Sequence, residues 1–122
     1  MKKIMTIVLS LLLVACTKGN DGYMQMKMDE ALKQMKQTSD YVLVDVRTKK
    51  EYESGHIPGA INIVNEEIDE SVQKILEDKD QNIYVYCRSG NRSKQASQKL
   101  VDMGYTNIIE IGGINTYSGN LE

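Results

Sequence analysis

The sequence predicts a single α/β domain with a mostly parallel central sheet flanked by helices. Apolar, β-branched runs alternate along the chain with stretches of helical periodicity, which is the pattern of strand–helix–strand units. Two of these runs, residues 41–46 and 83–86, are apolar or aromatic except for Asp45, as expected of strands buried on both faces. The 122 residues leave room for one domain.

The first half of the domain is expected to hold a helix, two strands and a short helical turn. Residues 26–35 place methionine, alanine and leucine at helical spacing, with acids early and lysines late, which complements the helix dipole. A strand over residues 41–46 and a helical turn over residues 49–53 follow, and Gly55 closes that turn. A corner containing the chain's proline then leads into a second strand over residues 60–64.

The second half repeats the alternation of helix and strand. Residues 66–76 carry apolar side chains on one face and predict an amphipathic helix. A third strand over residues 83–86 precedes a helix over residues 92–103, for which Gly104 is the predicted C-cap. A fourth strand over residues 107–111 leads to a C-terminal turn or helix.

The N-terminus predicts an export signal. Lys2 and Lys3 form a short basic start, and residues 4–14 are apolar except for two hydroxyl side chains. This run is too short for a permanent membrane-spanning helix, which needs about twenty residues, and suits the apolar region of a signal peptide.

The end of the apolar run indicates a lipid anchor. Residues 13–16 read Leu-Val-Ala-Cys and are followed by a polar stretch, which resembles the bacterial lipobox, whose cysteine is lipidated and becomes the new N-terminus. We therefore expect a lipoprotein signal peptide over residues 1–15, a lipidated N-terminus and tether over residues 16–25, and the domain over residues 26–122. The expected location is the extracytoplasmic face of a bacterial membrane. A secretory signal with a chance cysteine and an uncleaved anchor are the alternatives.

Charge and cysteine usage narrow the function. The formal net charge is −2 and no basic stripe is present, so nucleic acid is not an expected partner. If Cys16 carries lipid, Cys87 is the only remaining thiol, and an unpaired cysteine in an exported protein indicates a reactive group.

The chemistry is expected in residues 87–93, between a buried strand and a helix. Sites of parallel α/β domains lie at this carboxyl end of the sheet. The thiol of Cys87 would face the helix N-terminus and the loop amides, while Arg88 and Arg92 add positive charge, so the thiolate is favoured. Gly90 and Asn91 tolerate the backbone conformations that let such a loop curl. An inert, buried cysteine is the alternative reading.

This loop resembles the six-residue active-site loop of the rhodanese family of sulfurtransferases. Other segments resemble further family motifs in the same order: residues 44–47, 51–52, 55–62, 104–105 and 112–114. The similarity extends over roughly residues 26–119. It implies a rhodanese-like three-layer domain with the sheet between helices.

The resemblance also implies a reaction. Cys87 would accept a sulfane sulfur as a persulfide from a small sulfur-containing anion such as thiosulfate, and would pass it to cyanide, a thiol or a protein acceptor. No metal or organic cofactor is implied, and the domain is expected to be monomeric. The residues implied to bind the anion and stabilise the persulfide are Arg88, Ser89, Gly90, Asn91, Arg92 and Ser93.

Three polar residues upstream of the loop are assigned supporting roles. Arg47 and Glu51 are four residues apart and are expected to pair, and Asp45 could accept hydrogen bonds from loop amides. His56 is the only histidine; an architectural role is favoured over that of a general base. The methionines at 24, 26, 28 and 35 are read as tether and core and not as a metal site.

Two other functions are alternatives to a sulfurtransferase enzyme. Cell-cycle-type phosphatases share this fold, but their loop is one residue longer and ends in arginine, whereas Ser93 stands six residues after Cys87. A membrane-tethered persulfide carrier, or a redox or binding module for a partner protein, is the alternative to a sulfurtransferase enzyme.

Overall fold

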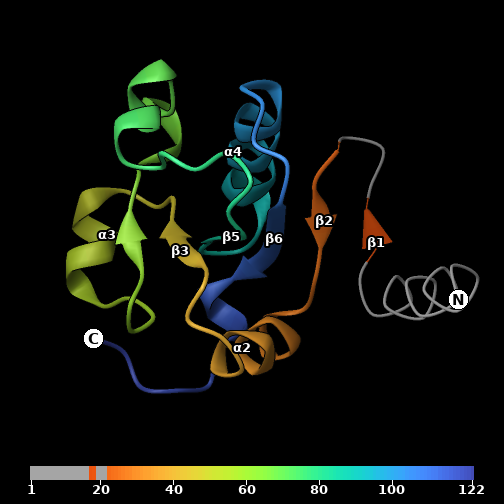
Figure 1. The fold of residues 1–122 in the computed structure, drawn as a ribbon. Coiled ribbons are helices and arrows are strands. Elements are labelled where there is room, and N and C mark those ends of the chain that lie inside the picture. The colour runs from red at the N-terminus through yellow and green to blue at the C-terminus, as the bar shows by residue number, and fades with distance from the viewer. Residues whose placement is uncertain (1–16, 19–21) are drawn as a thin grey trace, which may run out of the picture.

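The computed structural model describes residues 17–18 and 22–122, so the predicted signal peptide and Cys16 lie outside it. Its six described strands form one sheet in the order β1-β2-β6-β5-β3-β4, parallel except for the β1–β2 pair (Figure 1). The strands are β1 (Thr17–Lys18), β2 (Met24–Gln25), β3 (Val42–Asp45), β4 (Ile61–Asn62), β5 (Ile83–Cys87) and β6 (Ile108–Gly113).

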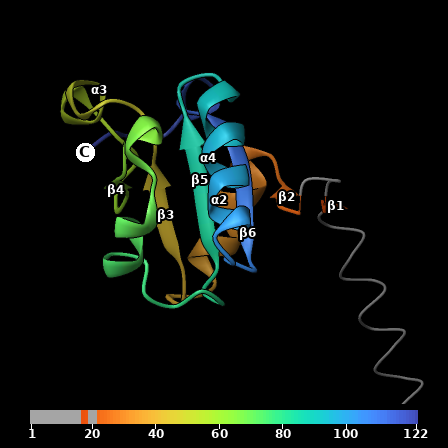
Figure 2. The ribbon, with the colours of Figure 1, turned by 90° about the horizontal axis from the view of Figure 1, so that it is seen from above.

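Helices cover both faces of this sheet, as predicted. Figure 2 shows α2 and α4 on opposite sides of it. The helices are α2 (Met28–Lys36), α3 (Lys49–Ser54) and α4 (Asn91–Asp102), and the 3-10 turns are η1 (Asn65–Glu67), η2 (Glu70–Lys74) and η3 (Ile114–Thr116). The predicted α/β class with a mostly parallel sheet and flanking helices is confirmed.

Strand β5 shows how the sequence builds the two cores. All five of its residues are buried, and successive side chains point to opposite faces. Ile83, Val85 and Cys87 join the core on the α4 face. Tyr84 and Tyr86 join the core on the other face, where α2 packs. The Cys87 side chain is therefore continuous with an apolar core that fixes its position.

The helix predicted over residues 66–76 is absent. The segment instead forms η1 and η2, separated by extended backbone at Ile68 and Asp69. The Asp69 carboxylate accepts hydrogen bonds from the amide and hydroxyl of Ser71, which favours a new turn over helix continuation. Val72 is buried, but Ile75 is 59% exposed, so the expected apolar face is only partly used.

The packed region begins before Met26, within the segment expected to be a tether. Tyr23 is buried in the α4-face core, and β2 pairs in parallel with β6. The amide of Met26 continues this pairing by donating to the carbonyl of Glu110, and α2 begins only at Met28. Met28 and Met35 are core residues, as predicted. No helix within the described ranges is long and apolar enough to cross a membrane.

Two glycines shape the ends of α4. Gly90 is its N-cap with φ +109°, and the helix begins at Asn91, one residue before the predicted start. Gly104, with φ +98°, directly follows the C-cap Met103, so the predicted role of a glycine at this end is confirmed within one residue.

Candidate active site around Cys87

Cys87 is the last residue of β5 and lies at the carboxyl edge of the sheet. Its residue is only 1% exposed, and it is a free thiol. The β5–β6 register shifts just before it, so that Cys87 lies opposite Gly113. The thiol is therefore held at the base of the loop and not at its surface.

Two polar groups contact the sulfur. The amide of Gly90 donates to Sγ at 3.0 Å, and the hydroxyl oxygen of Ser93 lies 3.4 Å from Sγ. The left-handed backbone of Gly90 turns this amide toward the sulfur, whereas Asn91 has ordinary helical geometry. A single loop amide, and not a ring of them, is hydrogen-bonded to the thiol in the described structure.

Arg92 connects the loop to the upstream motif. Its guanidinium forms two hydrogen bonds with Glu51, at 2.7 and 3.1 Å, whereas Glu51 was expected to pair with Arg47. That expected pairing is wrong. The hydrogen bond that Arg92 donates to Glu51 raises the pKa of Arg92, burial opposes this, and electrostatic interaction with the Cys87 side chain adds a smaller rise. Arg92 thus stays within electrostatic reach of the sulfur while Glu51 fixes its side chain.

Asp45 and Arg47 form a buried pair behind the site. Arg47 donates to Asp45 at 2.7 Å and to the carbonyl of Gly55 at the same distance. The Asp45 carboxylate also accepts from the amide of Arg47 and from the hydroxyl of Tyr86. The Arg47 amide, in the loop that follows β3, is the loop amide that bonds to Asp45. These residues fix the backbone around β3 and α3.

Glu51 has a second role as part of a capping box with Thr48. Its carboxylate accepts from the Thr48 amide, while the Thr48 hydroxyl accepts from the Glu51 amide. The bond from Arg92, with these bonds from Thr48, lowers the pKa of Glu51 from 4.5 to about 2. The link between α3 and α4 therefore depends on an ionised Glu51.

We predict that Glu51→Gln lowers the free energy of unfolding in a pH-dependent way. The folded pKa lies below the unfolded one, so the stabilisation is present above pH 4.5 and is lost as the pH falls toward about 2. The side chains of the ion pair are about a quarter exposed, so the expected loss near neutral pH is about 1 kcal/mol. Urea unfolding at a series of pH values measures the difference. An equal difference at pH 3 and pH 6 would contradict the ionised pair.

Gly113 allows a close approach of β6 to the loop that the sequence reading did not identify. A Cβ atom there would overlap the carbonyl oxygen of Arg88 and lie 2.5 Å from its carbonyl carbon. The same carbonyl accepts a hydrogen bond from the amide of Asn115. The loop backbone is thus clamped against the end of β6, while the side chains of Arg88 and Ser89 are exposed.

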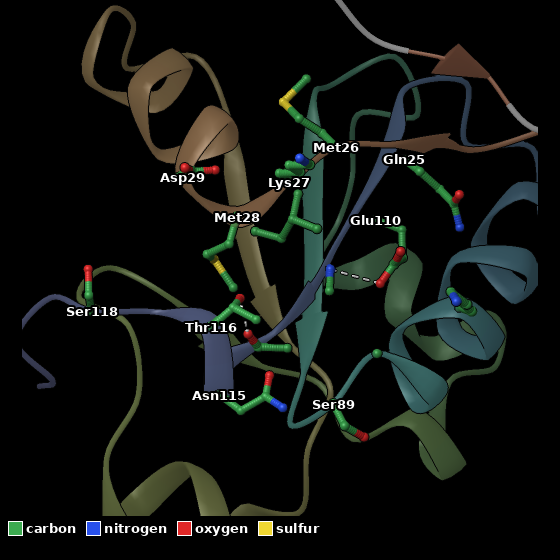
Figure 3. Close-up of a pocket in the computed structure, with 15 residues that line it drawn as sticks. Gln25, Met26, Lys27, Met28, Asp29, Ser89, Glu110, Asn115, Thr116 and Ser118 are labelled. Atoms are coloured by element: carbon green, nitrogen blue, oxygen red, sulfur yellow. Dashed lines mark hydrogen bonds between the residues drawn. The ribbon is translucent and has the colours of Figure 1, made fainter.

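An open groove of about 780 Å³ adjoins the loop (Figure 3). It runs from the start of α2 to the end of β6, and Ser89 and Gly90 line its loop side. Glu110 also lines it, a buried acid absent from the predicted site. The sequence signal was present, since Glu110 is the one charged residue in the apolar run of residues 108–111.

His56 packs between α3 and the C-terminal residue Glu122. Its ring stacks on Tyr52 at 3.8 Å, Nδ1 bonds to the carbonyl of Tyr52, and Nε2 lies 3.5 Å from Glu122. None of these contacts involves the Cys87 loop. Across residues 17–18 and 22–122, no group of three or more His, Cys, Asp or Glu side chains is arranged to hold a metal ion.

Known proteins similar to this chain share both fold and sequence. The thiosulfate sulfurtransferase PspE of Escherichia coli is 39% identical over 71 residues, which cover 58% of this chain and 68% of PspE. The putative sulfur carrier protein YrkF of Bacillus subtilis is 32% identical over 95 residues, 76% of this chain but only half of YrkF. A solved rhodanese with anions from E. coli superposes with a TM-score of 0.62 at 34% identity, covering 67% of this chain and 96% of the other.

The sequence also matches a family as a whole. Residues 28–120 match the family described as the Rhodanese-like domain, which is most of the chain and includes every element from α2 to η3. The chain therefore belongs to the rhodanese-like domain family.

Proposed function

We propose that this protein is a sulfurtransferase that carries sulfane sulfur on Cys87 as a persulfide, with thiosulfate or a similar anion as donor. The proposal rests on the position and contacts of the Cys87 thiol. It ends the central strand β5, accepts a hydrogen bond from the Gly90 amide, and lies within electrostatic reach of Arg92. The similarity to PspE, named a thiosulfate sulfurtransferase, supports sulfur transfer as the reaction class.

The proposed reaction has two half-reactions. The thiolate of Cys87 attacks the outer sulfur of the donor, the donor S–S bond breaks, and sulfite leaves with the electron pair. A thiolate or cyanide then attacks the terminal sulfur of the persulfide, and Cys87 leaves as thiolate. The Gly90 amide stabilises negative charge on the sulfur in both steps, as preorganised donors do. The enzyme is thus restored through a covalent intermediate.

Arg88 and Arg92 are proposed to attract the anionic donor. Arg88 is exposed beside the thiol, and Arg92 is held by Glu51 at the start of α4. In the phosphatases with the longer loop an arginine stands where this chain has Ser93. Here Ser93 is fully buried and bonded to Glu110, so it presents no cation to a phosphate.

The second candidate is a persulfide carrier that serves one partner protein. The similarity to YrkF, a putative sulfur carrier protein, favours it, as does the open groove beside Ser89 and Gly90, which could admit part of a protein acceptor. Steady-state assays with thiosulfate and a series of acceptors separate the two. Ping-pong turnover with cyanide or a small thiol supports the enzyme, whereas a persulfide that forms but is not turned over by small acceptors supports the carrier.

We further propose that the protein is exported and held on the extracytoplasmic face of a bacterial membrane through Cys16. The boundaries proposed are residues 1–15 for the signal peptide, 16–25 for the lipidated segment, whose last residues pack against the sheet, and 26–122 for the family domain. Thr17–Lys18 pairs with β2 at the sheet edge, so such an anchor would hold the domain close to the lipid surface.

Cys16→Ala is expected to abolish incorporation of a labelled fatty acid in cells. Each buried methylene of an acyl chain contributes about 0.8 kcal/mol, and stable anchoring takes more than one chain. The matched control is Cys87→Ser, which removes the other cysteine and should leave labelling intact. Fatty-acid label that persists in Cys16→Ala, or disappears in Cys87→Ser, would show that the anchor is not on Cys16.

A further inference from the structure

Glu110 is a buried acid without a cationic partner. The residue is 4% exposed, and none of the ion pairs formed by the described residues involves it. Its Oε2 accepts hydrogen bonds from the Gly112 amide at 2.9 Å and from the Ser93 hydroxyl at 2.5 Å. Burial of a carboxyl group without a cationic partner opposes folding, so packing alone does not account for this acid.

Ser93 lies between this acid and the thiol. Its hydroxyl oxygen is 3.4 Å from Sγ of Cys87 and 2.5 Å from Oε2 of Glu110, and the carbonyl of Gly90 is a third neighbour at 3.0 Å. A serine hydroxyl has one proton and can accept two others. The three groups therefore form a continuous hydrogen-bonded chain from sulfur to carboxylate.

We propose that Ser93 and Glu110 form a proton relay for Cys87. In one arrangement the thiol donates to Ser93, and Ser93 donates to the carboxylate. In the other, Glu110 holds the proton and donates to Ser93, which donates to the thiolate. The second arrangement gives the sulfur two donors, the Gly90 amide and the Ser93 hydroxyl, so charge on the sulfur is stabilised when the proton has moved.

The relay rests on the proposed sulfur transfer and supplies its proton step. The S–H bond of Cys87 breaks as an O–H bond forms on Ser93, and the original Ser93 proton forms an O–H bond on Glu110. The freed thiolate attacks the donor. When an acceptor thiolate later removes the terminal sulfur, the leaving Cys87 thiolate recovers the proton from Glu110 through Ser93. Glu110 acts through Ser93 and is a positioning residue, since it does not contact the sulfur.

Glu110 also gives the proton a route to solvent, because it lines the groove beside the loop (Figure 3). Other charged groups border this path from each neighbouring element and set its electrostatic field. Lys27 and Asp29 at the start of α2 and Lys94 in α4 line the groove, and Arg88 and Arg92 lie in the loop and at the start of α4. Glu51 forms an ion pair with Arg92 and partly offsets its positive charge.

The test is the pH dependence of Cys87 alkylation by iodoacetamide, which is uncharged and needs no sulfur donor. It is measured on the full chain by peptide mass spectrometry. In the wild type the proton can leave the thiol without leaving the protein, so the rate should vary only weakly between about pH 5 and about pH 7. In Glu110→Gln the proton must go to solvent, and the rate should rise about tenfold per pH unit. Relative to the wild type, the variant should therefore lose about 10²-fold in rate between about pH 7 and about pH 5.

Glutamine keeps an oxygen that can accept from Ser93 and Gly112, so the variant preserves the hydrogen bonds but not the proton acceptor. If the alkylation rates of the wild type and Glu110→Gln depend on pH in the same way, the relay is overturned. This includes the case in which the variant is slower by the same factor at every pH. Glu70→Gln, an exposed change of the same charge, is the control and should have the wild-type profile.

Should Glu110→Gln not fold, Ser93→Ala breaks the same chain at its centre and should give the same steep profile. A wild-type profile in Ser93→Ala would equally overturn the relay. The outcome is separate from the proposed function: a shallow wild-type profile without any persulfide from thiosulfate would refute the sulfur transfer and leave the relay in place.

Discussion

Cys87→Ser is expected to abolish sulfur transfer, with a loss on the order of 10³-fold or more. A serine hydroxyl at this position is a far weaker nucleophile at neutral pH and cannot hold a sulfane sulfur as a persulfide. The change is conservative in shape. The new hydroxyl can accept from the Gly90 amide and bond to Ser93 as the thiol does, so a loss of stability below about 2 kcal/mol is expected despite full burial.

Steady-state transfer from thiosulfate to cyanide measures this loss, and thermal melting measures stability. Cys16→Ala is the matched control, because it removes the only other cysteine and should retain the transfer rate. Substantial transfer by a folded Cys87→Ser protein would remove Cys87 from the mechanism and leave the family assignment without its working residue.

Gly113→Ala is expected to reduce transfer on the order of 10²-fold by displacing the loop. The new Cβ would overlap the carbonyl oxygen of Arg88, which is backbone and cannot move without carrying Cys87 and Gly90 with it. The backbone of Gly113 itself, with φ −121°, is open to any residue, so the clash alone causes the effect. Displacement of a reacting group by about 1 Å can cost 10² in rate.

Gly119→Ala is the matched control for this substitution. Its Cβ would overlap the Tyr117 hydroxyl, the end of a side chain that can rotate away from it. The expected result is a normal transfer rate in Gly119→Ala, and in Gly113→Ala a low rate with a stability loss of about 1 to 3 kcal/mol. A wild-type transfer rate in Gly113→Ala would show that the close approach of β6 does not position the thiol.

The fold could be predicted from the sequence where burial on both faces left a clear pattern. The runs at residues 41–46 and 83–86 became β3 and β5, because continuous apolar residues suit only the centre of a covered sheet. The helix predicted over residues 66–76 was wrong. The spacing of their apolar residues suits a helix, but the Asp69 carboxylate accepts a hydrogen bond from the Ser71 amide and begins a new turn. Strand β2 is two residues long and is formed by pairing with β6 and β1, which no local pattern indicates.

The position of the Cys87 loop could be predicted from the sequence, but the hydrogen bonds and ion pairs around it could not. The sequence pattern indicated that Cys87 lies between a strand and a helix. It also indicated a turn at Gly90. The pairing of Glu51 with Arg92 was not, because these residues are 41 positions apart and meet only when α3 and α4 are packed. The contact of Glu110 with Ser93 could not be predicted for the same reason, although Glu110 itself is marked by its charge within an apolar run.

The persulfide on Cys87 is the central claim, and mass spectrometry of the protein after reaction with thiosulfate tests it most directly. The reduced full chain is incubated with thiosulfate, trapped by alkylation and mapped peptide by peptide. The expected result is one added sulfur atom on the Cys87 peptide, lost on addition of cyanide or a thiol together with formation of the sulfurated acceptor. An unmodified Cys87 peptide in protein that is turning over thiosulfate, or sulfur found only on another residue, would contradict the claim.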